Sequence, residues 1–343
     1  MKNAINVGLV GAGRIGRVHA ENLASRIPEA NLIAVSDVFV EAAEKLAAEL
    51  QIPAAYADHH HILDDESVDA VLICSSTDTH AQFIAEAAAA GKQIFCEKPI
   101  ALDLEAIDGA LAAVEEAGVK LMIGFNRRFD PNFKRVREVV AAGEIGQPQV
   151  LRITSRDPAP PPIAYVQVSG GLFLDMTIHD FDMARYLMGS EVEQIYAAGE
   201  VLVDPDIGQA GDVDTAVITL HFENGALGVI DNSRQAVYGY DQRVEVFGSG
   251  GLVTADNDYP NSARISDAHR VHRDLPLNFF MDRYTESYIA EIRTFVRCIL
   301  NDEPLPVTGV DGRIPVVMGY AAKRSHELGR PVKLDEVERE AGL

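Results

Sequence analysis

Side chains that can transfer protons are concentrated in the stretch GLFLDMTIHDFDMARYLMG at residues 171–189. If the stretch is helical, Asp175, His179 and Asp182 share one face, whereas Asp180 points elsewhere. An adjoining apolar stripe is formed by Met176, Met183 and Leu187. The three polar side chains therefore lie at the edge of a buried face, where a charge needs a partner or a function. A carboxylate one turn from an imidazole can make it a general base; a purely structural His–Asp pair is the alternative.

A dinucleotide-binding motif follows the first apolar run, in GLVGAGRIGRVHAENLA. Gly11 permits a tight turn, Gly13 lets the backbone approach a pyrophosphate, and Gly16 lets the following helix pack on the strand. The helix N-terminus then offers N–H groups to the phosphates. The cofactor-binding residues that the motif predicts are Gly11, Gly13, Arg14, Ile15 and Gly16.

The next apolar run, NLIAVS, ends at Asp37. A carboxylate at this position can bond the adenosine ribose hydroxyl groups and repels a 2′-phosphate, and no arginine follows to neutralise one. We therefore expect NAD as the cofactor. Capping of the following helix is the alternative role of Asp37.

A lysine that can act on an alcohol, Lys98, lies in the sequence EKP after the apolar run KQIFC. At the carboxyl end of a strand it can donate to a substrate oxygen and stabilise the alkoxide that develops during oxidation; a solvated loop lysine is the alternative. The acids and histidine of 175–182 could ligate Zn²⁺ or Fe²⁺, but a nicotinamide enzyme with this lysine needs no Lewis acid, so no metal is expected. The consecutive histidines 59–61 are expected in a solvated loop.

The elements that must position these residues follow from the pattern of apolar runs. Up to Gly124, short apolar runs alternate with helical stretches, which predicts a parallel sheet covered on both sides. Later, two β-rich runs meet at Asn224-Gly225, a dipeptide typical of a hairpin turn, and VEVFGSGGLVTA predicts another hairpin. Helices are expected near 175–188 and 285–300. We predict an α/β Rossmann domain at 1–124 and an α+β domain with an open, mainly antiparallel sheet at 125–343, whose C-terminal helix can pack back on the first domain.

Composition narrows the partners. The chain has 343 residues and a formal net charge of −22, which disfavours nucleic acid and acidic membrane surfaces and favours a neutral small molecule. Its three cysteines are far apart, which suggests reduced thiols and the cytoplasm. No apolar run is long enough to span a membrane, and no export signal is evident. A soluble cytoplasmic protein is expected.

Several motifs together resemble the Gfo/Idh/MocA oxidoreductases over nearly the whole chain. They are GAGRIG at 11–16, Asp37, CEKP at 96–99, GFNRRFD at 124–130 and DMTIHDFDMARYLMG at 175–189. Within that family the chain is most similar to inositol 2-dehydrogenases, through GFNRRFD, SRDP at 155–158, SGG at 169–171 and YGYD at 238–241.

The resemblance implies a catalytic triad of Lys98, Asp175 and His179. His179 would take the hydroxyl proton, Asp175 would orient His179, and Lys98 would bond the reacting oxygen. The resemblance also implies a cis peptide bond before Pro99, which would aim the side chain of Lys98. The nicotinamide end would be lined by Ser75, Thr77, His80, Glu97 and Lys98. Besides the triad, polyol contacts would come from Asn126, Arg127, Asp157, Asp182 and Tyr238. Asp157 stands where relatives often have Asn, and Asn126 stands where they often have Met. Both positions are on the substrate side, so the sequence determines the stereochemistry of the substrate less well than the type of reaction.

The implied reaction is oxidation of the axial hydroxyl group of myo-inositol to 2-keto-myo-inositol with NAD. One alternative is scyllo-inositol or another sugar or polyol. Another, from a different class, is a non-catalytic dinucleotide-binding sensor, which would have no reason to keep the triad. The open sheet is implied to form a subunit interface in a homodimer or homotetramer.

Overall fold

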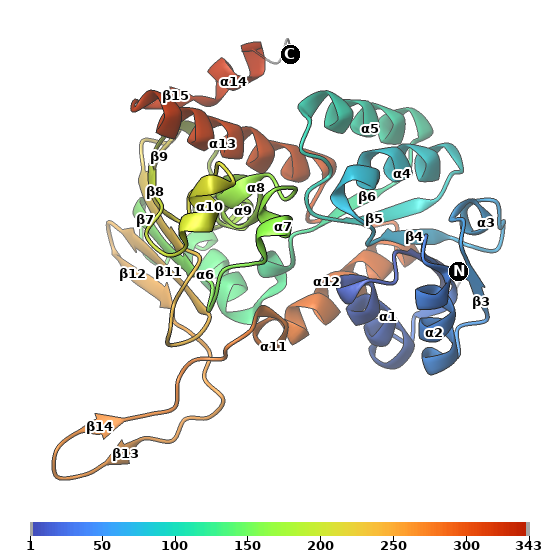
Figure 1. Cartoon of the computed structure of the whole chain (residues 1–343), viewed down its shortest axis with the longest axis horizontal. Coiled ribbons are helices and arrows are strands. Elements are labelled where there is room, and N and C mark those ends of the chain that lie inside the picture. The colour runs from blue at the N-terminus through green and yellow to red at the C-terminus, as the bar shows by residue number, and fades with distance from the viewer. Residues whose placement is uncertain (1–2, 341–343) are drawn as a thin grey trace. The chain divides into compact units, whose positions relative to one another are not determined.

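The apolar runs in the first part of the chain pair as one parallel sheet, with the strand order β3-β2-β1-β4-β5-β6 (Figure 1). Every residue of β4 and β6 is buried, as expected for strands that are covered on both faces. This confirms the predicted Rossmann architecture. The strands are β1 (Ile5–Val10), β2 (Ala30–Ser36), β3 (Ala54–Tyr56), β4 (Ala70–Ile73), β5 (Gln93–Glu97) and β6 (Leu121–Gly124).

The computed structural model describes residues 3–340, which divide into two compact units. The first unit runs to Phe129 and also contains residues 286–314; the second contains residues 130–285 and those from Pro315 on. Helices of the first unit are α1 (Arg14–Arg26), α2 (Val40–Leu50), α3 (His60–Leu63), α4 (Thr77–Ala89), α5 (Leu104–Ala117), the 3₁₀ turn η1 (Asn126–Phe129) and, from Glu286 on, α12 (Thr285–Leu300).

The second unit is built on a seven-stranded sheet with the order β12-β11-β7-β10-β9-β8-β15. Its neighbours are antiparallel except for β7 and β10, which are parallel. Both predicted hairpins are present, and Gly225 has the positive φ, 84°, that the turn between β9 and β10 requires. The strands are β7 (Pro148–Arg156), β8 (Val192–Glu200), β9 (Thr215–Phe222), β10 (Leu227–Ser233), β11 (Asp241–Gly248), β12 (Gly251–Ala255) and β15 (Val332–Lys333).

Helices cover one face of this sheet, and α9 packs on β7 and β10. On the opposite face apolar side chains are exposed, namely Tyr196, Val217, Leu227, Phe247 and Leu252. The helices are α6 (Pro131–Ala141), α7 (Ile163–Val166), α8 (Gly171–Asp175), α9 (Thr177–Met188), α10 (Pro205–Gln209), α11 (Phe280–Arg283), α13 (Gly309–Leu328), of which residues from Pro315 on belong here, and α14 (Leu334–Glu340).

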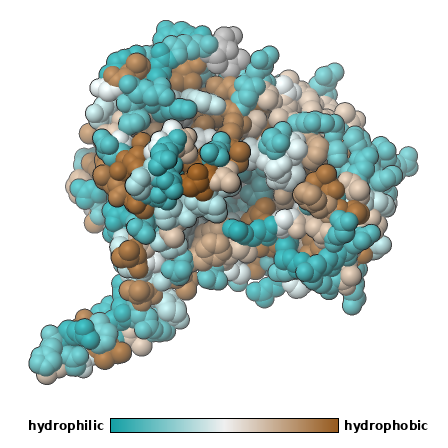
Figure 2. Space-filling view, viewed as in Figure 1, coloured by the Kyte–Doolittle hydropathy of each residue, from teal (hydrophilic) through white to brown (hydrophobic). Residues whose placement is uncertain are grey.

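A long excursion between β12 and α11 carries the short pair β13 (Ile265–Ser266) and β14 (Val271–His272) away from the sheet (Figure 1). Its surface is mostly hydrophilic with a few apolar side chains (Figure 2). Among residues 3–340 no helix is long and apolar enough to cross a membrane. All three cysteines are buried and reduced.

Candidate active site

The glycine motif forms a tight turn between β1 and α1. Gly11 has a φ of 101°, and a Cβ on it would lie 2.5 Å from the carbonyl oxygen of Cys74. A Cβ on Gly16 would lie 2.0 Å from the carbonyl oxygen of Gly11. A Cβ on Gly13, by contrast, would meet nothing within 4 Å. Gly11 and Gly16 are therefore required by packing inside the protein, whereas Gly13 borders open space, as a phosphate-binding turn demands.

The N-termini of α1 and α4 are open to a ligand. Gly13 and Ser76 stand at their N-cap positions, and neither provides a side-chain cap. In α5 of the same unit, Asp103 does cap the helix by accepting from the N–H groups of Glu105 and Ala106. Helix N-terminal N–H groups without a side-chain cap bind anions well, so the turn before Arg14 and Ile15 fits the pyrophosphate of a dinucleotide.

Asp37 fixes the turn from the neighbouring strand. Its Oδ2 accepts from the N–H of Ala12 at 2.7 Å, and its Oδ1 accepts from the N–H of Phe39 at 2.9 Å. The N-cap of α2 is Phe39, so the alternative that Asp37 is the helix cap is wrong. Val38 and Phe39 are exposed beside it and carry no positive charge that would attract a 2′-phosphate. The residues present fit an adenosine ribose with free hydroxyl groups.

The nicotinamide-side residues follow the carboxyl ends of β4, β5 and β6. Lys98 comes directly after β5 and is half-buried, and the Lys98–Pro99 peptide is cis, as the resemblance implied. His80 links two of these ends, because its Nδ1 lies 2.8 Å from the carbonyl oxygen of Pro99 and its Nε2 lies 3.1 Å from that of Ser75. Thr77 begins α4, whose third residue, Thr79, has its hydroxyl group 2.7 Å from that of Ser75.

Asn126 and Arg127 follow the adjacent strand, β6. Gly124 at the end of β6 pairs with Glu97 at the end of β5, so the residues after both strands emerge side by side. Asn126 and Arg127 are 3% and 5% exposed. Polar side chains that are buried to this extent need contacts with other protein groups or with a ligand. The first unit thus collects the glycine turn, Asp37, Lys98 and this pair at one edge of its sheet.

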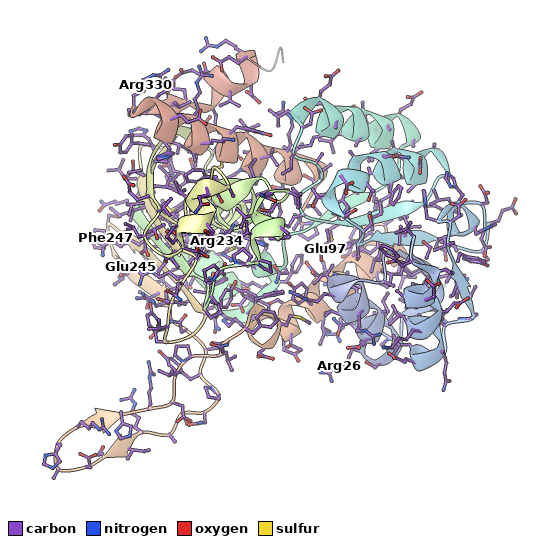
Figure 3. All side chains as sticks on the ribbon, in the orientation of Figure 1. Arg26, Glu97, Arg234, Glu245, Phe247 and Arg330 are labelled. Carbon is purple, nitrogen blue, oxygen red and sulfur yellow. The ribbon has the colours of Figure 1, made fainter. Side chains whose placement is uncertain are left out.

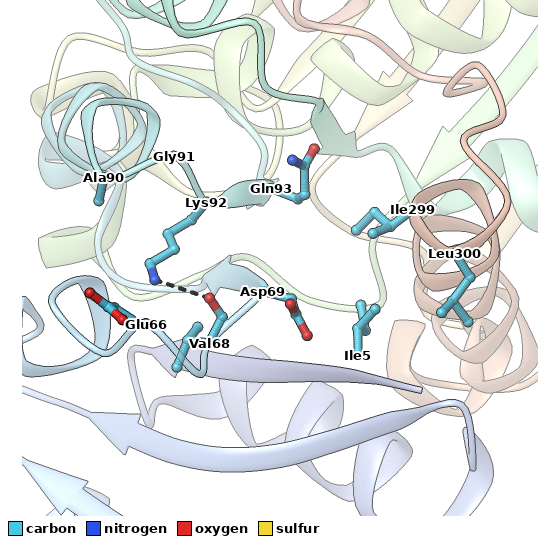
Figure 4. Close-up of a pocket in the computed structure, with 10 residues that line it drawn as sticks. All are labelled: Ile5, Glu66, Val68, Asp69, Ala90, Gly91, Lys92, Gln93, Ile299 and Leu300. Atoms are coloured by element: carbon cyan, nitrogen blue, oxygen red, sulfur yellow. Dashed lines mark hydrogen bonds between the residues drawn. The ribbon is translucent and has the colours of Figure 1, made fainter. Parts of the chain in front are cut away.

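A pocket of about 540 Å³ lies at the other edge of the same sheet (Figure 4). It is lined by residues at the amino ends of the strands, including Ile5, Asp69 and Gln93. Lys92 in its wall donates from Nζ to the carbonyl oxygens of Asp65 and Val68 at 2.7 and 3.0 Å. Because ligands of open parallel sheets bind at the carboxyl ends of the strands, this pocket is not the dinucleotide site.

In the second unit, acids converge on one arginine that the sequence analysis missed. Asp175 accepts from Arg234 Nη1 at 2.9 Å and from the hydroxyl group of Tyr165 at 2.8 Å. Asp157 Oδ2 lies 3.6 Å from the same Nη1. The Arg234 side chain (labelled in Figure 3) is only 3% exposed. Burial lowers and the nearby acids raise the pKa of Arg234, with a net rise, so the guanidinium remains charged.

The geometry around His179 differs from the expected single helix. The helix breaks at Met176, so Asp175 ends α8 and His179 lies in the first turn of α9. Asp180 does point elsewhere: its Oδ2 accepts from Asn232 Nδ2 at 2.9 Å, which pins α9 to β10. Asp182 is 1% exposed on the same helix. The structure therefore places Asp157, Asp175, His179 and Asp182 on adjoining elements of one unit.

Tyr238 belongs to a separate cluster. Its hydroxyl group donates to Asp241 Oδ2 at 2.5 Å and accepts from Arg156 Nη1 at 3.1 Å. Burial and then the carboxylate of Asp241 raise the pKa of Tyr238. This hydroxyl group is already engaged in both directions within the protein, which leaves it less suited to a polyol than the sequence suggested.

The expectation for the histidine run was wrong in part. His60 and His61 begin the short helix α3, and the imidazole of His59 is largely buried against Phe83, with its Nε2 2.6 Å from Glu86 Oε2. His60 Nδ1 lies 2.7 Å from Asp58 Oδ1. Each of these two imidazoles has a carboxylate partner, which a pattern of three consecutive histidines could not reveal.

Comparison with known proteins assigns the class. Residues 5–125 match the model of the oxidoreductase family with an NAD-binding Rossmann fold, and residues 133–254 match the GFO/IDH/MocA C-terminal domain. The chain belongs to the Gfo/Idh/MocA family of oxidoreductases, and its first unit is an NAD-binding domain.

Among curated proteins, the chain is 53% identical to a myo-inositol 2-dehydrogenase of Thermotoga maritima, covering 97% of this chain and 99% of that protein. It is 46% identical to an inositol 2-dehydrogenase of Rhizobium meliloti, covering 94% and 96%. Among solved structures, one described as a probable dehydrogenase from Thermotoga maritima superposes with a TM-score of 0.96 at 53% identity, covering 97% of this chain and 100% of that one. A scyllo-inositol dehydrogenase from Lactobacillus casei with bound NAD(H) and scyllo-inositol superposes with a TM-score of 0.90 at 30% identity, covering 97% and 99%.

Proposed function

We propose that this protein oxidises the axial hydroxyl group of myo-inositol to the ketone, 2-keto-myo-inositol, with NAD. The observation that carries the proposal is an NAD-binding turn and Lys98 at one sheet edge in a chain whose relatives of similar length are named inositol 2-dehydrogenases. The net charge of −22 agrees with a neutral substrate better than with an anionic one. A neutral polyol presents only hydroxyl groups, which suit the carboxylates and lysine of the candidate site.

In the proposed reaction each of three side chains has one role. NAD, when bound, supplies the acceptor for the hydride that leaves the substrate carbon. His179 takes the hydroxyl proton, and Lys98 donates a hydrogen bond to the same oxygen, where negative charge develops. Asp175 orients His179; both of its carboxylate oxygens already accept hydrogen bonds, from Tyr165 and Arg234, so it is held in one orientation.

The deciding experiment measures NADH formation by purified protein with myo-inositol, scyllo-inositol, chiro-inositols, glucose and xylose, and repeats the series with NADP⁺. We expect turnover mainly with myo-inositol and NAD⁺, rising with pH as His179 loses its proton. Lys98→Met should lower kcat/KM by about 10²- to 10³-fold, the usual effect of losing one donor to a developing oxyanion. Lys45→Met, which removes an exposed lysine of α2, is the matched control.

The contribution of His179 can be tested against that of Lys98. If both act on the same hydroxyl group, the loss in the double variant Lys98→Met with His179→Ala should be far smaller than the product of the single losses. Fully multiplicative losses would contradict a shared step.

A second candidate substrate is scyllo-inositol. The chain is 38% identical to a scyllo-inositol 2-dehydrogenase (NAD(+)) of Bacillus subtilis over 98% of each protein. Higher kcat/KM with scyllo-inositol than with myo-inositol would select this candidate. Tight NAD binding without turnover of any polyol or sugar in the panel would instead favour the non-catalytic sensor.

A further inference from the structure

A buried polar cluster lies behind the strand end that carries Lys98, inside the first unit. It contains His19 of α1, Glu97 at the end of β5 and Glu291 of α12, and one donor atom from each lies within 4.8 Å of those of the other two. His19 and Glu291 are 0% exposed and Glu97 is 8% exposed. His19 Nε2 lies 2.7 Å from Glu97 Oε1 (Glu97 is labelled in Figure 3). The proposed mechanism uses none of these contacts.

Glu291 is the member that lacks a partner. Neither of its carboxylate oxygens has a hydrogen-bond partner among the described residues, and the Nδ1 atom of His19 has none either. Besides His19, two titratable groups lie near Glu291. The carboxylate of Glu97 would repel a negative charge on Glu291, and the buried thiol of Cys74 is neutral. An ionised carboxylate in such surroundings is prohibitively costly, so something must neutralise Glu291.

Either a cation or a proton could neutralise it. A structural zinc site needs four protein ligands, and calcium or magnesium needs about six oxygen ligands, whereas this cluster offers three donor residues, two of which are 0% exposed. A single proton on Glu291 balances the charge without further ligands. Burial, followed by the charge of Glu97, raises the pKa of Glu291, which agrees with a protonated side chain.

We propose that Glu291 is a positioning residue that stays protonated and thereby keeps the carboxylate of Glu97 turned inward onto His19, which fixes the strand end from which Lys98 projects. A second negative charge at Glu291 would repel Glu97, and Glu97 is the only member of the cluster that reaches the surface. The role in catalysis rests on the proposed function, because it acts through Lys98.

The space around Glu97 makes its orientation decisive. A Cβ on Gly124 would lie 3.0 Å from Glu97 Oε2, so one carboxylate oxygen packs against β6 while the other meets His19. If Glu97 rotates outward, it leaves both contacts, and the backbone of the EKP segment loses its side-chain anchor. A misplacement of about 1 Å at a reacting group can cost about 100-fold in rate.

The test compares Glu291→Gln with Glu291→Leu. Both substitutions keep this side chain uncharged, as a protonated glutamate is, so kcat should stay within about threefold of wild type in each variant. The KM for NAD should change little in either variant. Glu286→Gln on the same helix, whose side chain is 73% exposed, is the control for the helix and should match wild type. A loss of about tenfold or more in kcat for Glu291→Gln, which keeps both the neutral charge and the shape of a protonated glutamate, would overturn the proposal.

Two further measurements do not depend on turnover. The infrared spectrum at neutral pH should contain the C=O band of a protonated carboxyl group that shifts on ¹³C-glutamate labelling and is missing from Glu291→Gln. A spectrum without that band would overturn the proposal, as would one equivalent of a divalent metal in the purified protein that is lost in Glu291→Gln. If the band is present but no polyol is oxidised, the protonated cluster stands and the proposed function fails.

Discussion

Alanine substitutions at Gly13 and Gly16 add the same methyl group to two positions of one turn, and we expect opposite results. At Gly16 the new Cβ would lie 2.0 Å from the carbonyl oxygen of Gly11, so α1 must move away from β1. Overpacking of this kind costs about 1–3 kcal/mol, which lowers the Tm by roughly 2–12 °C. Gly16→Ala should therefore be destabilised even without cofactor.

At Gly13 the backbone already has φ −69° and ψ −166°, which alanine adopts without strain, and nothing lies within 4 Å of the new Cβ. The loss of about 1 kcal/mol at an N-cap is offset by the gain of about 0.4–1 kcal/mol from a less flexible unfolded chain. The Tm should therefore stay nearly unchanged. The added methyl group would occupy the space that the pyrophosphate needs, so the Kd for NAD should rise about 10- to 100-fold, equivalent to about 1.4–2.8 kcal/mol.

Thermal denaturation without cofactor and titration with NADH measure the two effects separately. Gly109→Ala, inside α5 with open space around it, is the control: it should raise the Tm slightly and leave NAD binding unchanged. A Gly13→Ala protein that binds NAD as tightly as wild type would refute the placement of the pyrophosphate at this turn. An unchanged Tm for Gly16→Ala would refute the close packing of α1 on β1.

Three other substitutions test separate steps. Asp37→Ser should raise the KM for NAD and lower the ratio of kcat/KM for NAD to that for NADP. The reason is the loss of a carboxylate that bonds the ribose and repels a 2′-phosphate. Initial rates with both cofactors measure this ratio. Arg234→Met should lower the Tm by roughly 6–20 °C, since breaking a buried ion pair costs about 3–5 kcal/mol, whereas Arg152→Met, at a 65% exposed side chain paired with Glu245, should change it little. Burial raises the pKa of Glu291 in the folded state, whereas in the unfolded chain this carboxyl group loses its proton as the pH rises above about 4.3. The free energy of unfolding therefore falls as the pH rises from that value towards the pKa of Glu291 in the folded state. The Tm of Glu291→Gln minus that of wild type should therefore increase as the pH rises above about 5, and a constant difference would contradict a raised pKa.

The features that the sequence predicted well are those set by local pattern. Continuous apolar runs specify strands buried on both faces, and the spacing of Gly11, Gly13 and Gly16 specifies a turn whose three members have different space around them. Asn224-Gly225 specifies a hairpin because few other dipeptides adopt its backbone angles so easily. In each case the physical reason is contained within a few consecutive residues.

What the sequence could not predict depends on partners far along the chain. Arg234 lies beside Asp157 because β7 and β10 are parallel neighbours, and Glu291 meets Glu97 across nearly 200 positions of sequence. An arginine in NSRQA and a glutamate in an amphipathic helix carry no local sign of burial. The break at Met176 was missed for a related reason: the helical pattern continues through it, while tertiary contacts decide where a helix ends.

Asp157 is the residue at which substrate preference should be most open to change. It shares Arg234 with Asp175, but at 3.6 Å against 2.9 Å, so Asp175 keeps its cation when Asp157 is altered. Asp157→Asn should therefore leave the Tm nearly unchanged. It replaces a carboxylate, which only accepts hydrogen bonds from hydroxyl groups, by an amide, which can also donate them. A polar site discriminates strongly between isomers whose hydroxyl groups differ in position, so the ratio of kcat/KM for myo-inositol to that for scyllo-inositol should shift by more than about fivefold. Steady-state kinetics on both isomers give this ratio. An unchanged ratio, with activity retained, would show that Asp157 does not contact the substrate and that its charge serves only to hold Arg234.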